Sequence, residues 1–333
     1  MSVTAEIPPT WTTATTEAIK TGTWRSALPV HANRPSPCQD ACPVNGSIAD
    51  WIEHARKQRF YEAWRILTGS NPFPAVTGRI CHHPCEAACN RGGYDEALAI
   101  RRLERFVADM ALAGNWRFPA VAIRYGQRIA VVGAGPSGLA AAFHLRRMGY
   151  AVTVFEALAE PGGVMRYGIP PYRLPRDVLR QEITRLLALG IELNTGTPVN
   201  SLHAFEQLRR QYDVVYLAVG AGRSKRLPQL DYNREWAIDG SRYLAASGAE
   251  QAAKPAHMLV IGGGSAAMDV ARTARRRGAA VRVLCLEPEH LMPAQPEEIE
   301  EAREEGVAII DASMLQSVEE NGCGGLTIRC VKV

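Results

Sequence analysis

The chain has 333 residues, a formal net charge of +4 and 47% hydrophobic residues. A charge this small, scattered along the chain, argues against a nucleic-acid-binding or membrane-surface protein. No window approaches ~18 consecutive apolar residues, so we expect no membrane-spanning helix. The N-terminal "MSVTAEIPPTWTTATTEAIK" lacks the basic and apolar segments of a signal peptide. We therefore expect a cytoplasmic protein of two or three domains.

The first third of the chain is predicted to be helical. Residues 1–30, rich in Thr and Pro, predict an extended arm. Ser47 is a candidate cap for a helix over "IADWIEHARKQ", and a second helix is expected over "YEAWRILTGSNP". A longer helix is predicted over "DEALAIRRLERFVADMALAG", from Asp95 to Gly114. No strand pattern precedes about residue 127, so residues 31–125 predict an all-helical domain.

Two similar units follow, each with the order strand, glycine turn, helix, strand. They are "QRIAVVGAGPSGLAAAFHLRRMGYAVTVFEA" and "AHMLVIGGGSAAMDVARTARRRGAAVRVLCLE". "DVVYLAVGA" predicts a further buried strand, and the Pro- and Gly-rich "PGGVMRYGIPPYRLP" predicts a loop at a cofactor. This part is therefore expected to be α/β, with two dinucleotide sites or one very long site.

The first unit carries a dinucleotide-binding pattern in its required context. Gly133, Gly135 and Gly138 form G-x-G-x-x-G between an apolar strand and an Ala-rich helix. Its second strand ends at Glu156, close to the spacing of roughly 20 residues at which a carboxylate binds a ribose 2′-OH. The glycines allow the backbone to approach a pyrophosphate that the helix N-terminus attracts. The alternative is an ordinary glycine turn.

The second unit has a similar loop. Gly262, Gly263 and Gly264 follow the strand "HMLVI", and Ala266 or Ala267 occupies the third small position. Glu287 ends the following strand. A carboxylate there accepts bonds from a free 2′-OH and repels a 2′-phosphate, which favours NADH over NADPH. The alternative is that Glu287 is a solvated residue at a strand end.

Five cysteines lie close together in the helical part: Cys38, Cys42, Cys81, Cys85 and Cys89. Reduced thiols that cluster in a cytosolic chain are more often metal ligands or redox groups than disulfides. Zinc is the second choice, because its usual paired C-x2-C knuckles are missing. An iron–sulfur cluster needs four ligands, usually thiolates, which loops can deliver at mixed spacing. For His82 and His83 we expect exposed or locally bonded side chains that are not ligands.

Together these motifs resemble one family closely. "VVGAGPSGLAAA", "PGGVMRYGIPPYRLP" and "VIGGGSAAMDVARTARRRGA" are similar to the small (β) subunit of glutamate synthase and the N-terminal half of dihydropyrimidine dehydrogenase. The likeness runs from about Pro37 to the last residue, and "GGVMRYGIPPYRLP" is its most specific part. The resemblance implies a helical [4Fe–4S] domain over 31–125, an FAD domain over 126–254 and an inserted NAD(P)H domain over 255–333.

The resemblance also implies which residues contact the cofactors. The first glycine loop would hold FAD, with Glu156 on its ribose and Gly163 beside the flavin, and the second would hold NADH or NADPH. The residues that match cofactor-binding positions are Gly133, Gly135, Pro136, Ser137, Gly138, Glu156, Gly163, Arg173, Val199, Gly262, Gly264, Ser265, Ala266, Asp269 and Glu287. No acid–base dyad or nucleophile triad stands out, and direct hydride transfer needs none.

By the same resemblance, the cysteines divide between two clusters. One would use Cys42, Cys81, Cys85 and Glu104, and for Glu104 the alternative is a surface salt bridge with neighbouring arginines. The other would use Cys38, Cys89 and two further cysteines, but the matching positions hold Val30 and Asn33. His31 is one residue out of register with them. The resemblance therefore predicts one intact cluster and a second that lacks half its ligands.

Two further departures from the family affect the expected function. Arginines that suit a 2′-phosphate in many members are replaced here by Cys285, Leu286 and Glu287, which again favours NADH. The chain stops at "GGLTIRCVKV", inside the inserted domain, so both nucleotide domains are expected to be partial and to expose sheet edges. A fragment, a truncated gene or a split gene would explain this.

The expected function is an electron-transfer oxidoreductase module. It would take hydride from NAD(P)H to FAD and pass single electrons through [4Fe–4S] to an electron-accepting subunit or domain, with no nucleic-acid or membrane partner. The alternative is a truncated, non-catalytic iron–sulfur or assembly module without a functional FAD site.

Overall fold

The computed structural model of the chain describes residues 34–247, 255–321 and 325–333. The arm expected over residues 1–30 lies outside these ranges, and so do Val30, His31 and Asn33. Ser36–Val333 forms one compact unit. Within the described ranges, no helix combines the length and apolar character that a membrane crossing requires.

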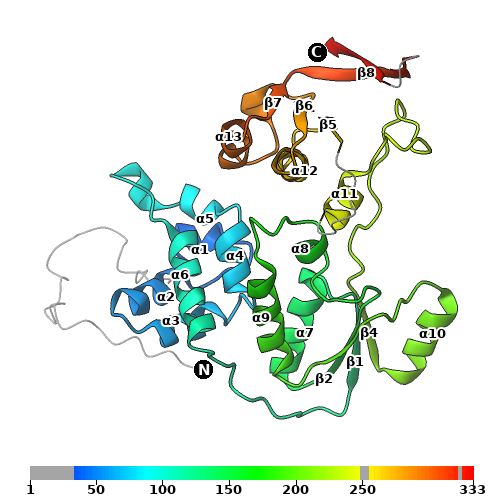
Figure 1. Ribbon diagram of the computed structural model, residues 1–333. Coiled ribbons are helices and arrows are strands. Elements are labelled where there is room, and N and C mark those ends of the chain that lie inside the picture. Colours follow the sequence, from blue (N-terminus) through cyan, green and yellow to red (C-terminus); the bar gives the residue numbers. More distant parts are fainter. Residues whose placement is uncertain (1–33, 248–254, 322–324) are drawn as a thin grey trace, which may run out of the picture. The chain divides into compact units, whose positions relative to one another are not determined.

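The first part of this unit is helical, as expected. Trp51 and Trp64 are its largest buried side chains and lie in one apolar cluster. The expected longer helix begins later than Asp95, because the Asp95 carboxylate accepts hydrogen bonds from Arg91 and from the Glu96 backbone in the preceding turn. The elements are α1 (Pro37–Asp40), α2 (Ile48–Arg56), α3 (Phe60–Leu67), α4 (Pro74–Ile80), α5 (Pro84–Ala87), the 3-10 helix η2 (Asn90–Gly93) and α6 (Ile100–Ala113) (Figure 1).

The first nucleotide fold is a parallel four-stranded sheet in the order β3-β2-β1-β4. Its first strand, helix and second strand follow the glycine-loop unit predicted from the sequence. The strands are β1 (Arg128–Val132), β2 (Ala151–Phe155), β3 (Glu192–Asn194) and β4 (Val214–Leu217). The helices are α7 (Pro136–Met148), α8 (Val164–Tyr167), α9 (Arg176–Leu187) and α10 (Leu202–Gln211). The short α8 lies within the segment expected to be a loop.

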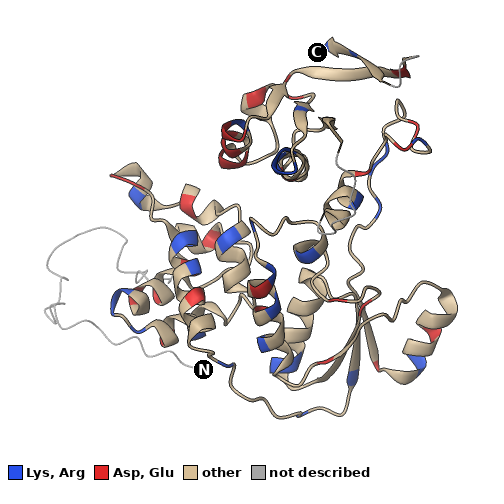
Figure 2. Ribbon diagram, in the orientation of Figure 1, with Lys and Arg blue, Asp and Glu red and all other residues tan. Residues whose placement is uncertain are grey.

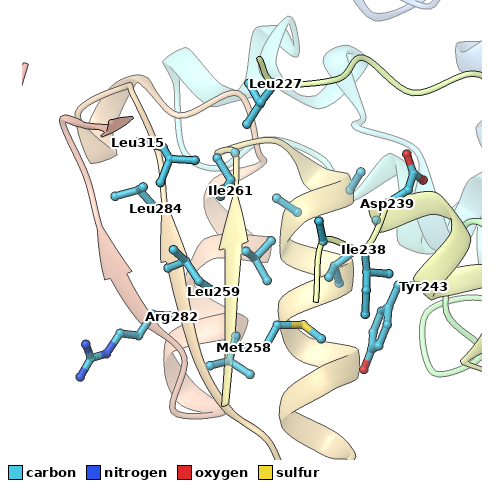
Figure 3. A pocket seen from close by; sticks show the side chains of 18 of the residues that line it. Leu227, Ile238, Asp239, Tyr243, Met258, Leu259, Ile261, Arg282, Leu284 and Leu315 are labelled. Atoms are coloured by element: carbon cyan, nitrogen blue, oxygen red, sulfur yellow. The ribbon is translucent and has the colours of Figure 1, made fainter. Parts of the chain in front are cut away.

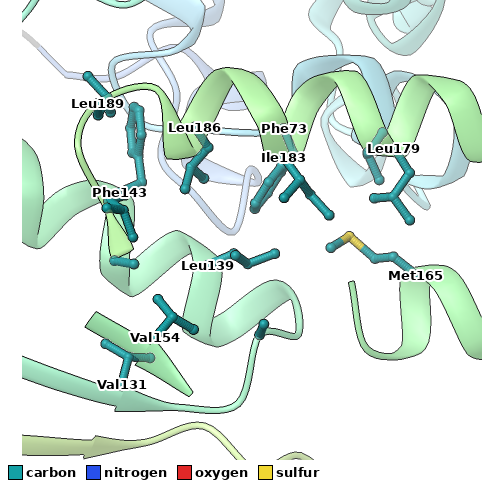
Figure 4. Packing of buried hydrophobic residues seen from close by; sticks show 14 of the residues in the cluster. Phe73, Val131, Leu139, Phe143, Val154, Met165, Leu179, Ile183, Leu186 and Leu189 are labelled. Carbon is teal, nitrogen blue, oxygen red and sulfur yellow. The ribbon is translucent and has the colours of Figure 1, made fainter. Parts of the chain in front are cut away.

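The core of this fold is shared with the helical part. Val131, Leu139, Phe143 and Val154 pack with Ile183 and Leu186 of α9 (Figure 4). Phe73, just before α4, belongs to the same cluster, together with Val76 of α4 and Ala108 of α6. One continuous apolar core therefore joins the helical part to the first nucleotide fold.

The prediction that "DVVYLAVGA" is a buried strand is wrong. β4 is the edge strand of the sheet, and Val214 and Leu217 are 51% and 58% exposed. The apolar run indicates burial on both faces, but among the described residues these side chains are only about half covered. β4 is thus an exposed sheet edge of the kind expected from the sequence.

The second nucleotide fold has a separate core. Its parallel sheet has the order β5-β6-β7, and Val260, Val281 and Val283 pack against Met268 and Ala271 of α12. A two-stranded antiparallel ribbon follows. The elements are α11 (Gly240–Ala246), β5 (His257–Ile261), α12 (Ser265–Arg276), β6 (Ala280–Leu284), the 3-10 helix η3 (Glu289–Leu291), α13 (Pro296–Glu304), β7 (Ala308–Ile310), β8 (Ser313–Glu320) and β9 (Leu326–Lys332).

Candidate functional site

The first glycine loop connects β1 to α7 and has two positions at which only glycine fits. A Cβ on Gly138 would lie 1.9 Å from the carbonyl oxygen of Gly133, and Gly133 itself has a φ of +108°. Gly135 is different, since a Cβ there would meet only the Cα of Gly163, at 3.9 Å. Pro136 and Ser137 form the first turn of α7, whose N–H groups have no partner within the helix. The loop thus offers an open approach to a helix N-terminus, which suits a pyrophosphate.

Glu156 lies where the sequence predicted, directly after β2, and is held by the backbone. Its Oε2 accepts a hydrogen bond from the Ala134 N–H at 2.7 Å, and its Oε1 accepts one from Leu158 at 2.9 Å. The residue is only 7% exposed. Each carboxylate oxygen has a second lone pair, so Glu156 can still accept a bond from a ribose hydroxyl while it orders the glycine loop.

The segment "PGG" lies directly against this loop. The N–H of Gly162 donates to the carbonyl of Ala134 at 2.8 Å, and a Cβ on Gly163 would lie 2.7 Å from the Cα of Gly135. Gly162 and Gly163 both have positive φ, at +127° and +50°. The structure therefore brings Gly163 to the first glycine loop. Val199 is half-buried, two residues after Thr197, whose N–H donates to the carbonyl of Glu156.

The second glycine loop, between β5 and α12, is more open. Gly262 has a φ of +125°, and a Cβ on Gly264 would have no heavy atom within 4 Å. Gly264 is the N-cap of α12, and Ser265 and Ala266 begin its first turn. Ala294 donates its N–H to the carbonyl of Gly263 at 3.0 Å, which fixes the loop from one side. This arrangement also presents helix N–H groups to a phosphate.

Glu287 lies beside this loop. A Cβ on Gly263 would lie 3.2 Å from Oε2 of Glu287, so the carboxylate is next to the backbone that a nucleotide would approach. Both residues line a pocket together with apolar side chains of the sheet. Figure 3 shows Leu259 and Ile261 of β5 in this pocket, with Tyr243 of α11. A mostly apolar pocket that also contains polar groups is typical of a cofactor site.

Arg173 and Asp269 contact each other, although they come from different nucleotide folds. Nη1 of Arg173 lies 2.7 Å from Oδ2 of Asp269, and Nη2 lies 2.5 Å from Oε1 of Glu298. Asp269 is on α12 and Glu298 is in the first turn of α13. Burial raises the pKa of Asp269, while Arg173 lowers it. The guanidinium is therefore committed to two protein carboxylates.

Cys42, Cys81 and Cys85 lie near one another and near Glu104. Burial raises the pKa of the Cys85 thiol to about 12, with smaller increases from Cys81, Cys42, Glu86 and Glu104. Burial also raises the pKa of Cys81, and Glu104 and Cys42 add to that shift. Cys81 caps the end of α4 and Cys85 lies in α5. His83 between them has a φ of +43° and donates its N–H to the Cys81 sulfur at 3.3 Å.

Glu104 points into the protein. Its Oε1 accepts hydrogen bonds from Thr77 Oγ1 and, at 2.9 Å, from Asn71 Nδ2. Burial raises the pKa of this carboxyl to about 7, although both hydrogen bonds lower it. This orientation argues against a surface salt bridge. It is compatible with the predicted role of Glu104 as a ligand beside Cys81 and Cys85.

Cys38 and Cys89 have other partners. Cys38 Sγ lies 3.1 Å from Ser36 Oγ, and Cys89 Sγ accepts the Leu98 N–H at 3.4 Å, which lowers the pKa of Cys89. His83 Nδ1 lies 3.2 Å from the Cys81 carbonyl oxygen and is locally bonded, whereas His82 is exposed. Among the described residues, no group of three or more His, Cys, Asp or Glu side chains is arranged so that it could hold a metal ion.

The donors present nevertheless suit an iron–sulfur cluster. Thiols with N–H donors to their sulfurs are its usual surroundings, because such hydrogen bonds tune the cluster potential. Arg101 lies close by: its Nη1 is 3.5 Å from the Cys81 carbonyl oxygen. Its N–H donates to Glu86, which thereby caps α6. The loop with Cys81 and Cys85 is thus tied to α6, which carries Glu104.

Several residues of the site were missed from the sequence. Asn71 and Thr77 orient Glu104, and Glu298 completes the contact of Arg173. Glu182 of α9 is 1% exposed, accepts the Ala75 N–H at 3.1 Å and pairs with Arg185 at 2.9 Å. Of these residues, only Glu182 could have been noticed in the sequence, because it interrupts the apolar face of its helix.

Comparison with known proteins yields two family matches. Residues 17–116 match dihydropyrimidine dehydrogenase domain II, 4Fe-4S cluster. Residues 127–332 match pyridine nucleotide-disulphide oxidoreductase. The boundary between them falls between α6 and β1. These matches confirm the fold class predicted from the sequence, a helical iron–sulfur region followed by α/β nucleotide folds.

Curated relatives extend over most of the chain. The NADP(+)-dependent formate dehydrogenase subunit beta of Moorella thermoacetica is 38% identical over 300 residues, covering 82% of this chain and 42% of its own length. The NAD-dependent dihydropyrimidine dehydrogenase subunit PreT of Escherichia coli K12 is 35% identical over 292 residues, covering 86% of this chain and 70% of its own length. The chain thus spans less than half of the first relative.

A solved structure supports the fold alone. FprA of Mycobacterium tuberculosis in complex with NADPH matches with a TM-score of 0.50 and 16% identity, over 62% of this chain and 67% of that one. The expected resemblance is therefore confirmed by sequence relatives and by fold. The chain belongs to the pyridine nucleotide-disulphide oxidoreductase family and carries, before that region, a match to dihydropyrimidine dehydrogenase domain II with its 4Fe-4S cluster.

Proposed function

We propose that the chain is an electron-transfer module that accepts hydride from NADH, in preference to NADPH, and delivers single electrons to a partner subunit or domain. When bound, FAD and the nicotinamide nucleotide supply hydride transfer and a [4Fe–4S] cluster supplies single-electron transfer. The proximity of Cys42, Cys81, Cys85 and Glu104 carries the proposal, because these four side chains would hold a one-electron site in a chain that also has nucleotide folds.

The first glycine loop is the proposed FAD site. Gly133, Gly135 and Gly138 let the pyrophosphate approach the start of α7, where Pro136 and Ser137 lie. Glu156 orients the loop and accepts a ribose hydroxyl. Gly163, which has no side chain between loop and ligand, would lie against the flavin. Val199 would border the same site.

The second glycine loop is the proposed nicotinamide nucleotide site. Gly262, Gly264, Ser265 and Ala266 would face the pyrophosphate. Glu287 would accept hydrogen bonds from a free 2′-OH and repel a 2′-phosphate, since its carboxylate lies against Gly263. The relatives are named for NAD dependence in one case and for NADP(+) dependence in another, so the preference rests on Glu287.

One cluster is proposed for this chain, held by Cys42, Cys81, Cys85 and Glu104. Cys38 and Cys89 would belong to a second cluster that lacks two of its ligands, since Val30 and Asn33 have no suitable donor. The relatives are named as subunits, which supports a partner that receives the electrons. Arg101, bonded to the Cys81 carbonyl, would keep the ligand loop in place.

The test is the visible spectrum of the purified protein, with iron and sulfide counts, for the wild type and two matched variants. The wild type should contain flavin and about four irons per chain. Cys42→Ala should lose the iron, and Cys89→Ala should retain it. About eight irons would overturn the single-cluster assignment. Iron without flavin would instead support a non-catalytic iron–sulfur or assembly module.

A further inference from the structure

One ion pair of the first nucleotide fold lies inside the protein, against the helical part. Glu182 and Arg185 are three residues apart on α9, and Nη1 of Arg185 lies 2.9 Å from Oε1 of Glu182. Figure 2 shows charged residues of both signs on α9, but the side chains of this pair are only 1% and 7% exposed. The guanidinium carbon of Arg185 lies 5.3 Å from the centre of the Trp64 ring. A buried ion pair loses hydration, so its remaining polar atoms need hydrogen-bond partners.

These partners are at the ends of two helices of the helical part. Oε2 of Glu182 accepts the N–H of Ala75 at 3.1 Å. Ala75 is the second residue of α4, so its N–H has no partner within that helix. Nη2 of Arg185 donates at 2.9 Å to the carbonyl of Ala111 in the last turn of α6, which also accepts the Trp116 N–H. The ion pair therefore holds the start of α4 and the end of α6.

The helices α4 and α6 carry two of the proposed cluster ligands and touch each other. α4 ends directly before Cys81, and Glu104 lies in the second turn of α6. A Cβ on Gly78 of α4 would lie 2.6 Å from the Cα of Arg105, so the two backbones are in direct contact. Thr77 of α4 also donates a hydrogen bond to Glu104. The two ligand helices are thus held together, and the ion pair holds one end of each.

On its other side, α9 is packed against the first glycine loop. A Cβ on Gly162 would lie 3.2 Å from Cδ2 of Leu179, and the Gly162 N–H donates to the carbonyl of Ala134 in that loop. Leu179 and Ile183 belong to the same apolar core as Leu139 of α7 (Figure 4). Apolar packing is non-directional, whereas charge-assisted hydrogen bonds are directional. The ion pair therefore adds a defined geometry to the apolar contact between α9 and the ligand helices.

We propose that Glu182 and Arg185 are positioning residues that fix α4 and α6, and with them Cys81 and Glu104, against the flavin-binding fold. They act through the two helices and are not cofactor ligands. The spacing of flavin and cluster sets the rate of the electron-transfer step between them, so the pair would control that step. This consequence rests on the proposed function, whereas the contacts with the two helices exist without any cofactor.

The test compares the wild type with two variants of the pair. The double variant Glu182→Met, Arg185→Met removes both charges and both helix contacts but keeps apolar volume, which a buried ion pair commonly tolerates. Glu182→Gln, the conservative second variant, keeps the test open if the double variant does not fold. The control is Glu206→Met, Arg209→Met, because this pair on α10 has the same spacing and a distance of 3.0 Å but is 40% and 59% exposed.

Amide hydrogen exchange of the purified proteins is the first measurement. The double variant should exchange faster over residues 74–80 and 100–113, with β1 and β5 unchanged. Glu182→Gln should exchange faster in α6 only, because glutamine still accepts the Ala75 N–H but no longer holds Arg185 by charge. The control should match the wild type. Unchanged exchange in both helices of the double variant would overturn the proposal, and so would an equal increase throughout the chain.

Anaerobic single-turnover reduction by NADH is the second measurement, with flavin and cluster absorbance followed separately. In the double variant the flavin should be reduced at the wild-type rate, whereas reduction of the cluster should slow roughly tenfold or more, because a small misplacement is enough to slow a transfer step. A wild-type rate of cluster reduction would overturn the positioning role. Slower reduction of the flavin itself would do so as well, because the pair would then act on the nucleotide site.

Iron counts separate this proposal from the proposed function. Loss of iron from the double variant, together with faster exchange, would support the proposal, because Cys81 and Glu104 would then no longer be held in place. A wild type without iron would refute the proposed function. The exchange result alone would then decide whether the ion pair holds the two helices.

Discussion

The two nucleotide folds share one order of elements but differ in how firmly each glycine loop is built. In the first, Gly138 touches the Gly133 carbonyl and Glu156 is bound to two backbone N–H groups. In the second, Gly264 has free space around it and Glu287 is half-exposed. A closely packed loop suits a cofactor that stays bound, and an open one suits a nucleotide that must enter and leave. The difference fits a resident FAD and an exchanging nicotinamide nucleotide.

The folds also differ in how they join the rest of the chain. The first shares an apolar core with α4 and α6 through Phe73, Val76 and Ala108. The second has its own core, and its contacts with the first include the ion cluster of Arg173. Apolar contact is non-directional, whereas an ion cluster defines one geometry. The helical part and the first fold are therefore expected to behave as one rigid body.

The largest expected effect on stability comes from adding a methyl group to the first glycine loop. The same addition to the second loop is the comparison. Gly138→Ala should destabilise the protein by about 3 kcal/mol or more and abolish flavin retention, because its Cβ would lie 1.9 Å from a backbone oxygen. Gly264→Ala should unfold at the wild-type urea midpoint, since nothing lies within 4 Å. Equal midpoints for the two variants would remove the contrast between the loops.

Replacement of Glu156 and Glu287 by alanine should show the same contrast between the two loops, with a smaller change in the unfolding free energy. Glu156→Ala should cost about 2 kcal/mol, because the N–H groups of Ala134 and Leu158 lose their acceptor and Ala134 is fully buried. Glu287→Ala should leave the unfolding free energy within about 0.5 kcal/mol of the wild type. Urea titration of both variants measures this. A larger loss for Glu287→Ala would reverse the comparison.

The join between the helical part and the first fold should respond to pH. Burial raises the pKa of Glu182 to about 7 from 4.5, so the folded state keeps a proton that the unfolded state releases. The unfolding free energy should therefore decrease from about pH 4.5 to pH 7, by at most about 3 kcal/mol, and level off above.

Glu182→Gln should reduce this slope, because glutamine accepts the Ala75 N–H without titrating. In protein prepared without its cluster some slope should remain, since burial also raises the pKa of Glu104 to about 7. Unfolding midpoints at a series of pH values provide the measurement. An identical slope in wild type and variant would exclude Glu182 as its source.

The smallest effect on stability and a specific effect on function are expected at Glu287. Glu287→Arg should shift the ratio of kcat/KM for NADH over NADPH toward NADPH by at least about tenfold, because a guanidinium attracts the 2′-phosphate that the carboxylate repels. Glu319→Arg, on the exposed β8, is the control. An unchanged ratio would contradict the proposed role of Glu287.

Much of both nucleotide folds was predictable, because their signals are local. An apolar strand, a glycine turn and an amphipathic helix follow one another within a few residues, so β1, α7, β5 and α12 start close to the expected positions. Gly163 was expected beside the flavin only through the family resemblance, and the structure brings it against Gly135. The burial of β4 was not predictable, since it depends on what packs on the sheet.

The contacts that connect the parts could not be predicted from the sequence. Arg173 is 96 residues from Asp269 and 125 from Glu298, and no local pattern links them. Asn71 and Thr77 lie in turn-like sequence, yet they orient Glu104 across 33 and 27 residues. The start of α6 was placed too early because Asp95 resembles an N-cap, whereas its carboxylate stabilises the preceding turn.

Anaerobic reduction of the bound flavin by NADH and by NADPH, followed by single-turnover absorbance, tests the central claim most directly. The account predicts that NADH bleaches the flavin band and that it does so with a higher second-order rate constant than NADPH. A protein that contains flavin but is bleached by neither nucleotide would contradict it.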